Sequence, residues 1–272
     1  MKLNLITKIA SRLYSALLLG LSTLGVSSCS EPVSVADPEL VEKVLKDRVL
    51  EKSLEYQADS DTHRYSLSIP RSYDSKSKLP VIVYLHGKGG DENSELLYFS
   101  FYVNSIAKEC GIEQPLIIFP SNQNGLYLLD QGQHLANRLL QHIAPRFSVE
   151  AFNKRILAGF SIGGAAATRT AIIHPNSYAV SVSWAGGLWP NDAVLFSSVK
   201  NNAGTHIENN FTAHLFIGGE DSPHLYDPLI SAMKEYEVSY NRLLLKRQKH
   251  NLGQYLERTR EEFKSVMCTV FK

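Results

Sequence analysis

Cysteine is scarce in this sequence, neither charge is in excess, and no apolar run is long. Three cysteines in 272 residues are too few for a disulfide scaffold. The 28 basic and 27 acidic residues leave a formal net charge of +1, so we expect no broad basic face and no nucleic-acid partner. No stretch reaches the ~20 apolar residues that a membrane-spanning helix needs.

Metal-binding motifs are lacking as well. The sequence contains neither His-Glu-x-x-His nor a clustered Cys and His spacing, so it predicts no metal site and no cofactor. What the chain does have is 44% hydrophobic residues, enough for a full core. Its length suits one large α/β domain.

The first 28 residues are typical of a secretory signal peptide. They carry Lys2, Lys8 and Arg12 and no acid, followed by an apolar stretch over residues 13–26. A basic start, an apolar middle of this length and a small-residue end are the marks of such a signal. We therefore expect residues 1–28 to be removed from the mature protein.

The end of this segment resembles a bacterial lipobox. In Val26-Ser-Ser-Cys29 the cysteine would be diacylated on sulfur and become the mature N-terminus. Ser30 resembles the sorting signal for the outer membrane, which predicts a lipoprotein of the bacterial envelope, on its periplasmic or surface face. Residues 29–46 are predicted to be a tether with a short helix over 38–46, and residues 47–272 to be the folded domain.

Beyond the tether, strand and helix patterns alternate. Residues 54–70 alternate as a β-hairpin does, around a turn at residues 59–61. Continuous apolar runs, typical of buried parallel strands, cover residues 80–85, 116–119, 156–158, 178–184, 214–217 and 243–245. Helical patterns cover residues 96–110, 135–143, 165–173, 229–240 and 255–266. The order predicts an α/β fold with a mostly parallel sheet flanked by helices and an antiparallel N-terminal hairpin at one edge.

One motif carries a nucleophile. Gly159-Phe-Ser161-Ile-Gly163 stands between a predicted strand and a predicted helix. A serine at the tip of such a turn needs neighbours without side chains, and the helix that follows directs free amides at developing negative charge. The triplet also occurs by chance in glycine-rich turns, so its position between strand and helix is what favours Ser161 as the nucleophile.

A glycine-rich loop follows the first buried strand. In Leu85-His-Gly87-Lys88-Gly-Gly90 the backbone approaches the mouth of the sheet, and the Lys88 and Ile162 N–H groups could bind an oxyanion. The loop lacks the Gly-Lys-Ser/Thr ending of a phosphate-binding loop. We take His86 as structural, and Gly87 as a candidate substrate-binding residue.

An acid and a histidine follow the last two predicted strands. Asp221 and His250 come after Ser161 in the Ser, Asp, His order that this architecture uses. Glu220 and Asp227 are the competing acids. Neighbouring side chains along a strand point to opposite faces, so Glu220 and Asp221 cannot both aim at the same imidazole without a local turn. Asp227 precedes Pro228 at the start of the next predicted helix, where its carboxylate would serve as a cap.

Together these motifs resemble a serine esterase of the α/β-hydrolase superfamily, nearest its phospholipase/carboxylesterase and dienelactone-hydrolase-like branches. Residues 85–93 are similar to the oxyanion loop of that group, and residues 159–165 and 171–175 to its nucleophile elbow and helix. The resemblance runs from about Arg64 to about Phe263. The sequence departs from the family pattern at the strand that precedes the acid, which reads Gly-Gly-Glu-Asp221 where many relatives have His-Gly. This departure leaves open which position carries the catalytic acid.

The resemblance implies hydrolysis of carboxylic esters through an acyl-enzyme, with small-molecule or polymer-borne esters as substrates. Peptide or amide cleavage by the same triad, and an inactive scaffold with a binding role, are the alternatives. Trp184 and Trp189 are candidates for a substrate subsite, although core packing explains Trp184 equally well. Residues 191–212 are predicted to be a polar insertion too short for a large lid, hence an open site.

The resemblance also bears on the two cysteines that remain if Cys29 is acylated. In the arrangement that it implies, the helices ending near Cys110 and Cys268 pack on the same sheet face. A disulfide and two free thiols are both open.

Overall fold

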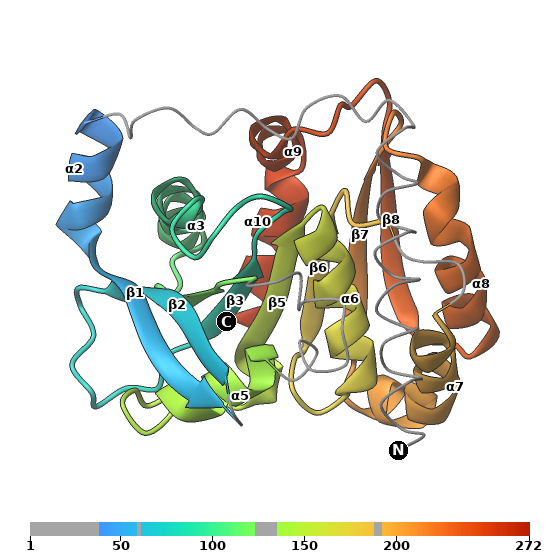
Figure 1. Ribbon diagram of the computed structural model, residues 1–272, viewed down its shortest axis with the longest axis horizontal. Helices are drawn as coiled ribbons and strands as arrows, with labels where there is room; N and C mark the ends of the chain where they lie inside the picture. Colours follow the sequence, from blue (N-terminus) through green and yellow to red (C-terminus); the bar gives the residue numbers. More distant parts are fainter. Residues whose placement is uncertain (1–37, 59–60, 123–134, 188–191) are drawn as a thin grey trace, which may run out of the picture. The chain divides into compact units, whose positions relative to one another are not determined.

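The structure, a computed structural model, describes residues 38–58, 61–122, 135–187 and 192–272. Its sheet has eight strands in the order β1-β2-β4-β3-β5-β6-β7-β8 (Figure 1). β1 pairs antiparallel with β2 and β2 with β4, and all other pairs are parallel, which confirms the predicted fold class. The strands are Arg48–Ala58, Asp61–Pro70, Val81–Leu85, Leu116–Pro120, Arg155–Phe160, Val180–Trp184, Thr212–Gly218 and Ser239–Leu245, β1 to β8.

Helices cover both faces of the sheet (Figure 1). On one face lie α5 (Leu135–Ile143), α6 (Ile162–Ile173), α7 (Ala193–Glu208) and α8 (Asp227–Glu235). On the other lie α3 (Leu96–Cys110), α9 (Leu252–Arg258) and α10 (Arg260–Val270). Short 3-10 turns, η3 (Phe152–Lys154) and η4 (Pro223–Tyr226), precede β5 and α8.

The central strands are buried on both sides, as their continuous apolar runs predict. In β3, Val81 and Val83 pack toward the α5–α8 face, whereas Ile82 and Tyr84 pack toward α3 and α10. All four side chains are fully buried. At ~25 cal/mol for each Å² of apolar surface removed from water, such side chains supply most of the driving force for folding.

Three predicted boundaries are wrong. The supposed polar insertion at residues 191–212 is mostly α7, which buries Leu195 and Val199 and begins at an Asp192 cap that accepts from the Leu195 N–H at 3.0 Å. Helix α8 ends at Glu235; the predicted extension to residue 240 covers a turn at residues 236–238 and the first two residues of β8. The last predicted helix is two helices, broken at Thr259.

The side chain of Thr259 bonds at the point where α9 ends and α10 begins. Its hydroxyl donates to the Tyr255 carbonyl at 2.8 Å and accepts from Trp184 Nε1 at 2.9 Å. A threonine side chain that bonds back to the preceding turn competes with the helical ladder and bends the helix. Both α9 and α10 pack against the same sheet face.

Part of the predicted tether is packed against the domain. Helix α2 (Pro38–Asp47) matches the expected short helix, and its Val44 is fully buried. Asp47 pairs with Lys108 of α3 at 2.6 Å. The predicted signal peptide, Cys29 and Ser30 lie outside the described residues.

Cys110 and Cys268 form a disulfide that joins α3 to α10, with their Cα atoms 5.4 Å apart. Of the two alternatives that the sequence left open, the paired one is found. The bridge closes a stretch of chain with a sequence separation of 158 residues.

Candidate active site

Ser161 lies at the sharp turn between β5 and α6. Its φ of 56° and ψ of −125° lie outside the regions that residues with a side chain prefer, at a cost of about 1–3 kcal/mol. Two backbone hydrogen bonds hold the turn: the Ser161 N–H donates to Trp184 O at 2.8 Å, and Ser161 O accepts from the Ala165 N–H at 3.0 Å. The residue before it, Phe160, is buried, whereas Ser161 is partly exposed.

The two flanking glycines are required by close backbone contacts. A Cβ added at Gly163 would lie 2.0 Å from Leu85 O, and one added at Gly159 would lie 2.4 Å from Gly163 O. Neither contact can be relieved by moving a flexible side chain, because both partners are backbone atoms. The turn thus packs directly against the end of β3.

The structure brings Ser161, His250 and Asp221 together from three loops at the carboxyl ends of β5, β8 and β7. His250 Nε2 lies 2.9 Å from Ser161 Oγ, and His250 Nδ1 lies 3.0 Å from Asp221 Oδ1. This arrangement suits an imidazole that donates its Nδ1 proton to the carboxylate and accepts from the serine hydroxyl at Nε2. The side chains of His250 and Asp221 are 30% and 11% exposed, so the histidine is more open to solvent than the acid.

Neither competing acid faces this histidine. Glu220 is exposed, and its N–H donates to Gln248 O at 3.3 Å. Asp227 is also exposed and pairs with Arg242 at 3.4 Å. The expected capping role of Asp227 is wrong: Tyr226 occupies the N-cap of α8, and Asp227 lies in the first turn without a capping hydrogen bond.

Tyr255 is a residue at this site that the sequence analysis missed. Its hydroxyl donates to Asp221 Oδ2 at 2.5 Å, opposite the oxygen that faces His250. The side chain is fully buried in α9. The available signal was its position five residues after His250, but a tyrosine on an apolar helix face also fits simple core packing.

The glycine-rich loop lies next to the nucleophile. A Cβ added at Gly87 would lie 3.4 Å from the Ser161 Cβ. His86 is buried and pins the loop: Asn122 N–H donates to its Nε2 at 3.0 Å, so the ring proton sits on Nδ1, which donates to Gly87 O at 2.8 Å. Because a trans peptide points its C=O and N–H in opposite directions, the Lys88 N–H points away from His86.

His86 holds the loop as a neutral ring. Burial lowers the pKa of His86 below its usual value, and the hydrogen bond to Gly87 acts in the opposite direction. The structural role that the sequence suggested for His86 agrees with these two contacts. Ile162, whose amide is the other candidate oxyanion donor, is the first residue of α6.

The end of this loop is fastened to the N-terminal hairpin. The register of β1 shifts between Glu51 and Leu54, and within this irregular stretch Ser53 has a φ of 51°. The Ser53 hydroxyl then donates to Glu92 Oε1 at 3.0 Å and accepts from Asn93 Nδ2 at 2.9 Å. Strand β1 therefore supports the candidate oxyanion loop from outside the parallel sheet.

Of the two tryptophans, only Trp184 lies among the described residues. It is fully buried against the α3 and α10 face, with Phe99, Phe216 and Phe263 around it, so it belongs to the core. Trp189 lies outside the described residues, and so its predicted role has no structural account.

Within the described ranges, no group of three or more His, Cys, Asp or Glu side chains could hold a metal ion. The same part of the chain contains no helix that is both long enough and apolar enough to span a bilayer.

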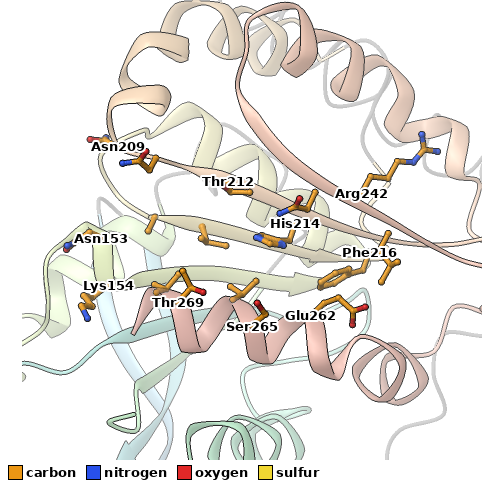
Figure 2. Close-up of a pocket in the computed structure, with 17 residues that line it drawn as sticks. Asn153, Lys154, Asn209, Thr212, His214, Phe216, Arg242, Glu262, Ser265 and Thr269 are labelled. Atoms are coloured by element: carbon orange, nitrogen blue, oxygen red, sulfur yellow. The ribbon is translucent and has the colours of Figure 1, made fainter. Parts of the chain in front are cut away.

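A hollow of about 840 Å³ lies between α10 and the strands β6, β7 and β8. Figure 2 shows Thr212 and His214 of β7 facing Ser265 and Thr269 of α10 across it. Burial lowers the pKa of His214 to about 4. None of Ser161, Asp221 and His250 lines this hollow.

The sheet order and the serine, histidine and acid at three neighbouring strand ends define a serine hydrolase with the α/β-hydrolase fold. A family model for esterases, described as "Putative esterase", matches residues 60–237, and the chain belongs to this family. It is therefore a carboxylic-ester hydrolase of the serine esterase type. Curated protein sequences gave no match.

Solved structures share the fold at low sequence identity. A ferulic acid esterase has a TM-score of 0.69 at 13% identity, covering 83% of this chain and 99% of its own. A ferulic acid esterase from Anaeromyces mucronatus has a TM-score of 0.68 at 12% identity, covering 90% and 97%. The S-formylglutathione hydrolase of Staphylococcus aureus has a TM-score of 0.60 at 15% identity, covering 83% and 98%.

Proposed function

We propose that the protein cleaves carboxylic esters through a covalent acyl-enzyme on Ser161. The observation that carries the proposal is the continuous hydrogen-bonded chain from Ser161 Oγ through His250 to Asp221. His250 Nε2 takes the hydroxyl proton as Oγ attacks the acyl carbon. The carbonyl π electrons move onto oxygen, and a tetrahedral oxyanion forms.

The Lys88 and Ile162 N–H groups donate to this oxyanion in the proposed mechanism. Each such donor is worth about 3–4 kcal/mol in the transition state. The C–O bond to the alcohol then breaks, and His250 gives its proton to the leaving oxygen. Water, deprotonated by His250, attacks the acyl-enzyme, which releases the acid and restores Ser161. Asp221 orients the imidazole and stabilises its charged form.

The acyl group is best sought first among hydroxycinnamates. Two of the three structural neighbours described above are ferulic acid esterases, and one structure of the Anaeromyces mucronatus enzyme contains ferulic acid. Acetyl esters, other short-chain esters, polyester fragments and thioesters are the comparison substrates. A panel of methyl ferulate, graded p-nitrophenyl esters and S-formylglutathione ranks them by kcat/KM.

A fluorophosphonate probe separates an enzyme from an inactive scaffold. We expect wild type to be labelled on Ser161 and Ser161→Ala to stay unlabelled. Failure of wild type to react would favour the scaffold, since the probe needs only an activated serine. Matched anilides of the best ester test the peptidase and amidase alternative, which predicts comparable turnover of both.

We also propose that the mature protein is anchored through a diacylated Cys29 in the outer membrane of a bacterial envelope. Two features support this: the signal-like segment with its lipobox, and the Cys110–Cys268 bridge, because structural disulfides persist in oxidising compartments. Mass spectrometry of the N-terminal peptide from membrane fractions tests it. An unmodified peptide, or membrane association unaffected by Cys29→Ala, would contradict the anchor.

A further inference from the structure

The carboxylate of Asp221 is held from two sides by one segment of chain. His250 contacts Oδ1 at 3.0 Å, and Tyr255 donates to Oδ2 at 2.5 Å. Between them Asn251 caps α9: its side chain accepts from the Gln254 N–H, and its carbonyl accepts from the Tyr255 N–H at 3.1 Å. The position of Tyr255 is thus fixed relative to His250 by a single helical turn.

We propose that Tyr255 is a positioning residue for catalysis, which fixes the Asp221 carboxylate and sets how strongly it polarises His250. The inference rests on the roles proposed above for Asp221 and His250. Its basis is the hydrogen bond to the oxygen that His250 leaves free, made by a hydroxyl with no access to solvent.

The end of β7 leaves room for this hydroxyl. A Cβ added at Gly218 would lie 2.3 Å from the Tyr255 hydroxyl oxygen and 2.8 Å from Asp221 Oδ2. The glycine therefore opens the space in which donor and acceptor meet.

The Tyr255 hydroxyl donates this hydrogen bond while it remains protonated. Burial, and then the hydrogen bond to Asp221, raise the pKa of Tyr255 well above its ordinary value. Tyr226, which also lies near Asp221, is fully buried, and burial raises its pKa in the same direction. Both hydroxyls therefore stay neutral.

A hydrogen bond to a carboxylate withdraws part of its charge. Without it, Asp221 carries more charge toward the imidazole, which favours the protonated form of His250. The acid limb of the kcat/KM profile reports this ionisation in the free enzyme. Removing the hydroxyl should therefore move that limb to higher pH, whereas a loss of helix packing would leave it in place.

The test compares Tyr255→Phe with Tyr102→Phe. Tyr102 is a matched control, because it is buried and its hydroxyl donates at 3.0 Å to Leu256 O, on the same helix, without touching Asp221. We expect Tyr255→Phe to lower kcat ~10-fold or more with KM within about twofold, the size of effect known for the loss of groups that orient metal-binding histidines. Its acid limb should rise by about half a pH unit, and that of Tyr102→Phe should match wild type.

A second variant keeps the packing intact. With 3-fluorotyrosine at position 255 the ring is nearly unchanged and the hydroxyl is a stronger donor, so the acid limb should shift to lower pH. A Tyr255→Phe profile that coincides with that of Tyr102→Phe, together with no shift for fluorotyrosine, overturns the inference. The variant Asp221→Asn distinguishes failure of the proposed triad from failure of the role proposed for Tyr255. If Asp221→Asn retains wild-type turnover, the proposed acid is wrong. If Asp221→Asn is inactive and Tyr255→Phe is unaffected, only the role of Tyr255 is rejected.

Discussion

Removing the Cys110–Cys268 disulfide should cost stability without costing activity. The bridge spans 158 residues of sequence, and in the chain-entropy model a loop of that size restricts the unfolded state by about 5 kcal/mol. For a domain of this size, 1 kcal/mol corresponds to roughly 2 °C in Tm. The double variant Cys110→Ser/Cys268→Ser is therefore expected to melt about 10 °C lower, an upper value because strain and residual structure in the unfolded chain reduce the effect.

The native contacts between α3 and α10 do not depend on the bridge. Arg260 and Lys264 of α10 both pair with Glu109 of α3, at 2.6 and 3.0 Å, and lower its pKa to about 2. Tyr102 and Phe263 stack with their ring centroids 5.7 Å apart. These contacts should hold the two helices together in the folded state, so esterase activity at 25 °C is expected to be unchanged.

Calorimetry with and without a reductant measures the effect. Reductant should lower the Tm of wild type toward that of the double variant, and it should leave the double variant itself unchanged. A shift below about 2 °C would refute the entropic argument. Loss of activity in the reduced protein at 25 °C would show instead that the bridge maintains the site.

Three further predictions follow from the site and from the hollow beside α10. Ser161→Ala should lower ester turnover by ~10⁴-fold or more with little change in Tm, measured by initial rates and calorimetry, and more than about a tenth of wild-type turnover would exclude Ser161 as nucleophile. Asp221→Asn should lower kcat by orders of magnitude, whereas Asp227→Asn, which loses only an exposed ion pair, should keep its rate and lose under ~1 kcal/mol; the reverse result would move the acid. Burial lowers the pKa of His214 to about 4 in the folded state, from 6.5 for the free side chain. As the pH falls from 6.5 toward 4, the unfolded state therefore binds a proton at this residue before the folded state does, and the folded protein loses stability. The Tm of His214→Asn should thus fall less steeply than that of wild type between pH 6.5 and 4, and parallel curves would contradict this assignment.

The sequence predicted the parts of the fold whose signals are local. Ser161 could be found because its two glycines stand between an apolar strand and a helix, and His250 because it alone among the histidines follows the last strand. Helix α7 was missed because only Leu195 and Val199 mark its buried apolar side, although Asp192 offered a capping signal. These elements show that periodicity identifies strands buried on both faces more readily than half-exposed helices.

The contact between Tyr255 and Asp221 could not be predicted, because it joins residues 34 positions apart through a hydroxyl on an otherwise apolar helix face. The disulfide needed knowledge of which helices share a sheet face, and that came from the resemblance rather than from cysteine spacing. The break at Thr259 depends on a partner, Trp184, that lies 75 residues earlier. In each case the deciding interaction is made between distant parts of the chain.

The bulge in β1 has a practical consequence for anyone who wishes to express this protein in shortened form. The segment by which the chain is assigned to its family begins at residue 60 and ends at residue 237. Ser53, which braces the loop beside the nucleophile, lies before that segment, and His250 and Tyr255 lie after it. A gene trimmed to the recognised boundaries would still be identified as an esterase, yet its product would lack the proposed base and the outer brace of the oxyanion loop.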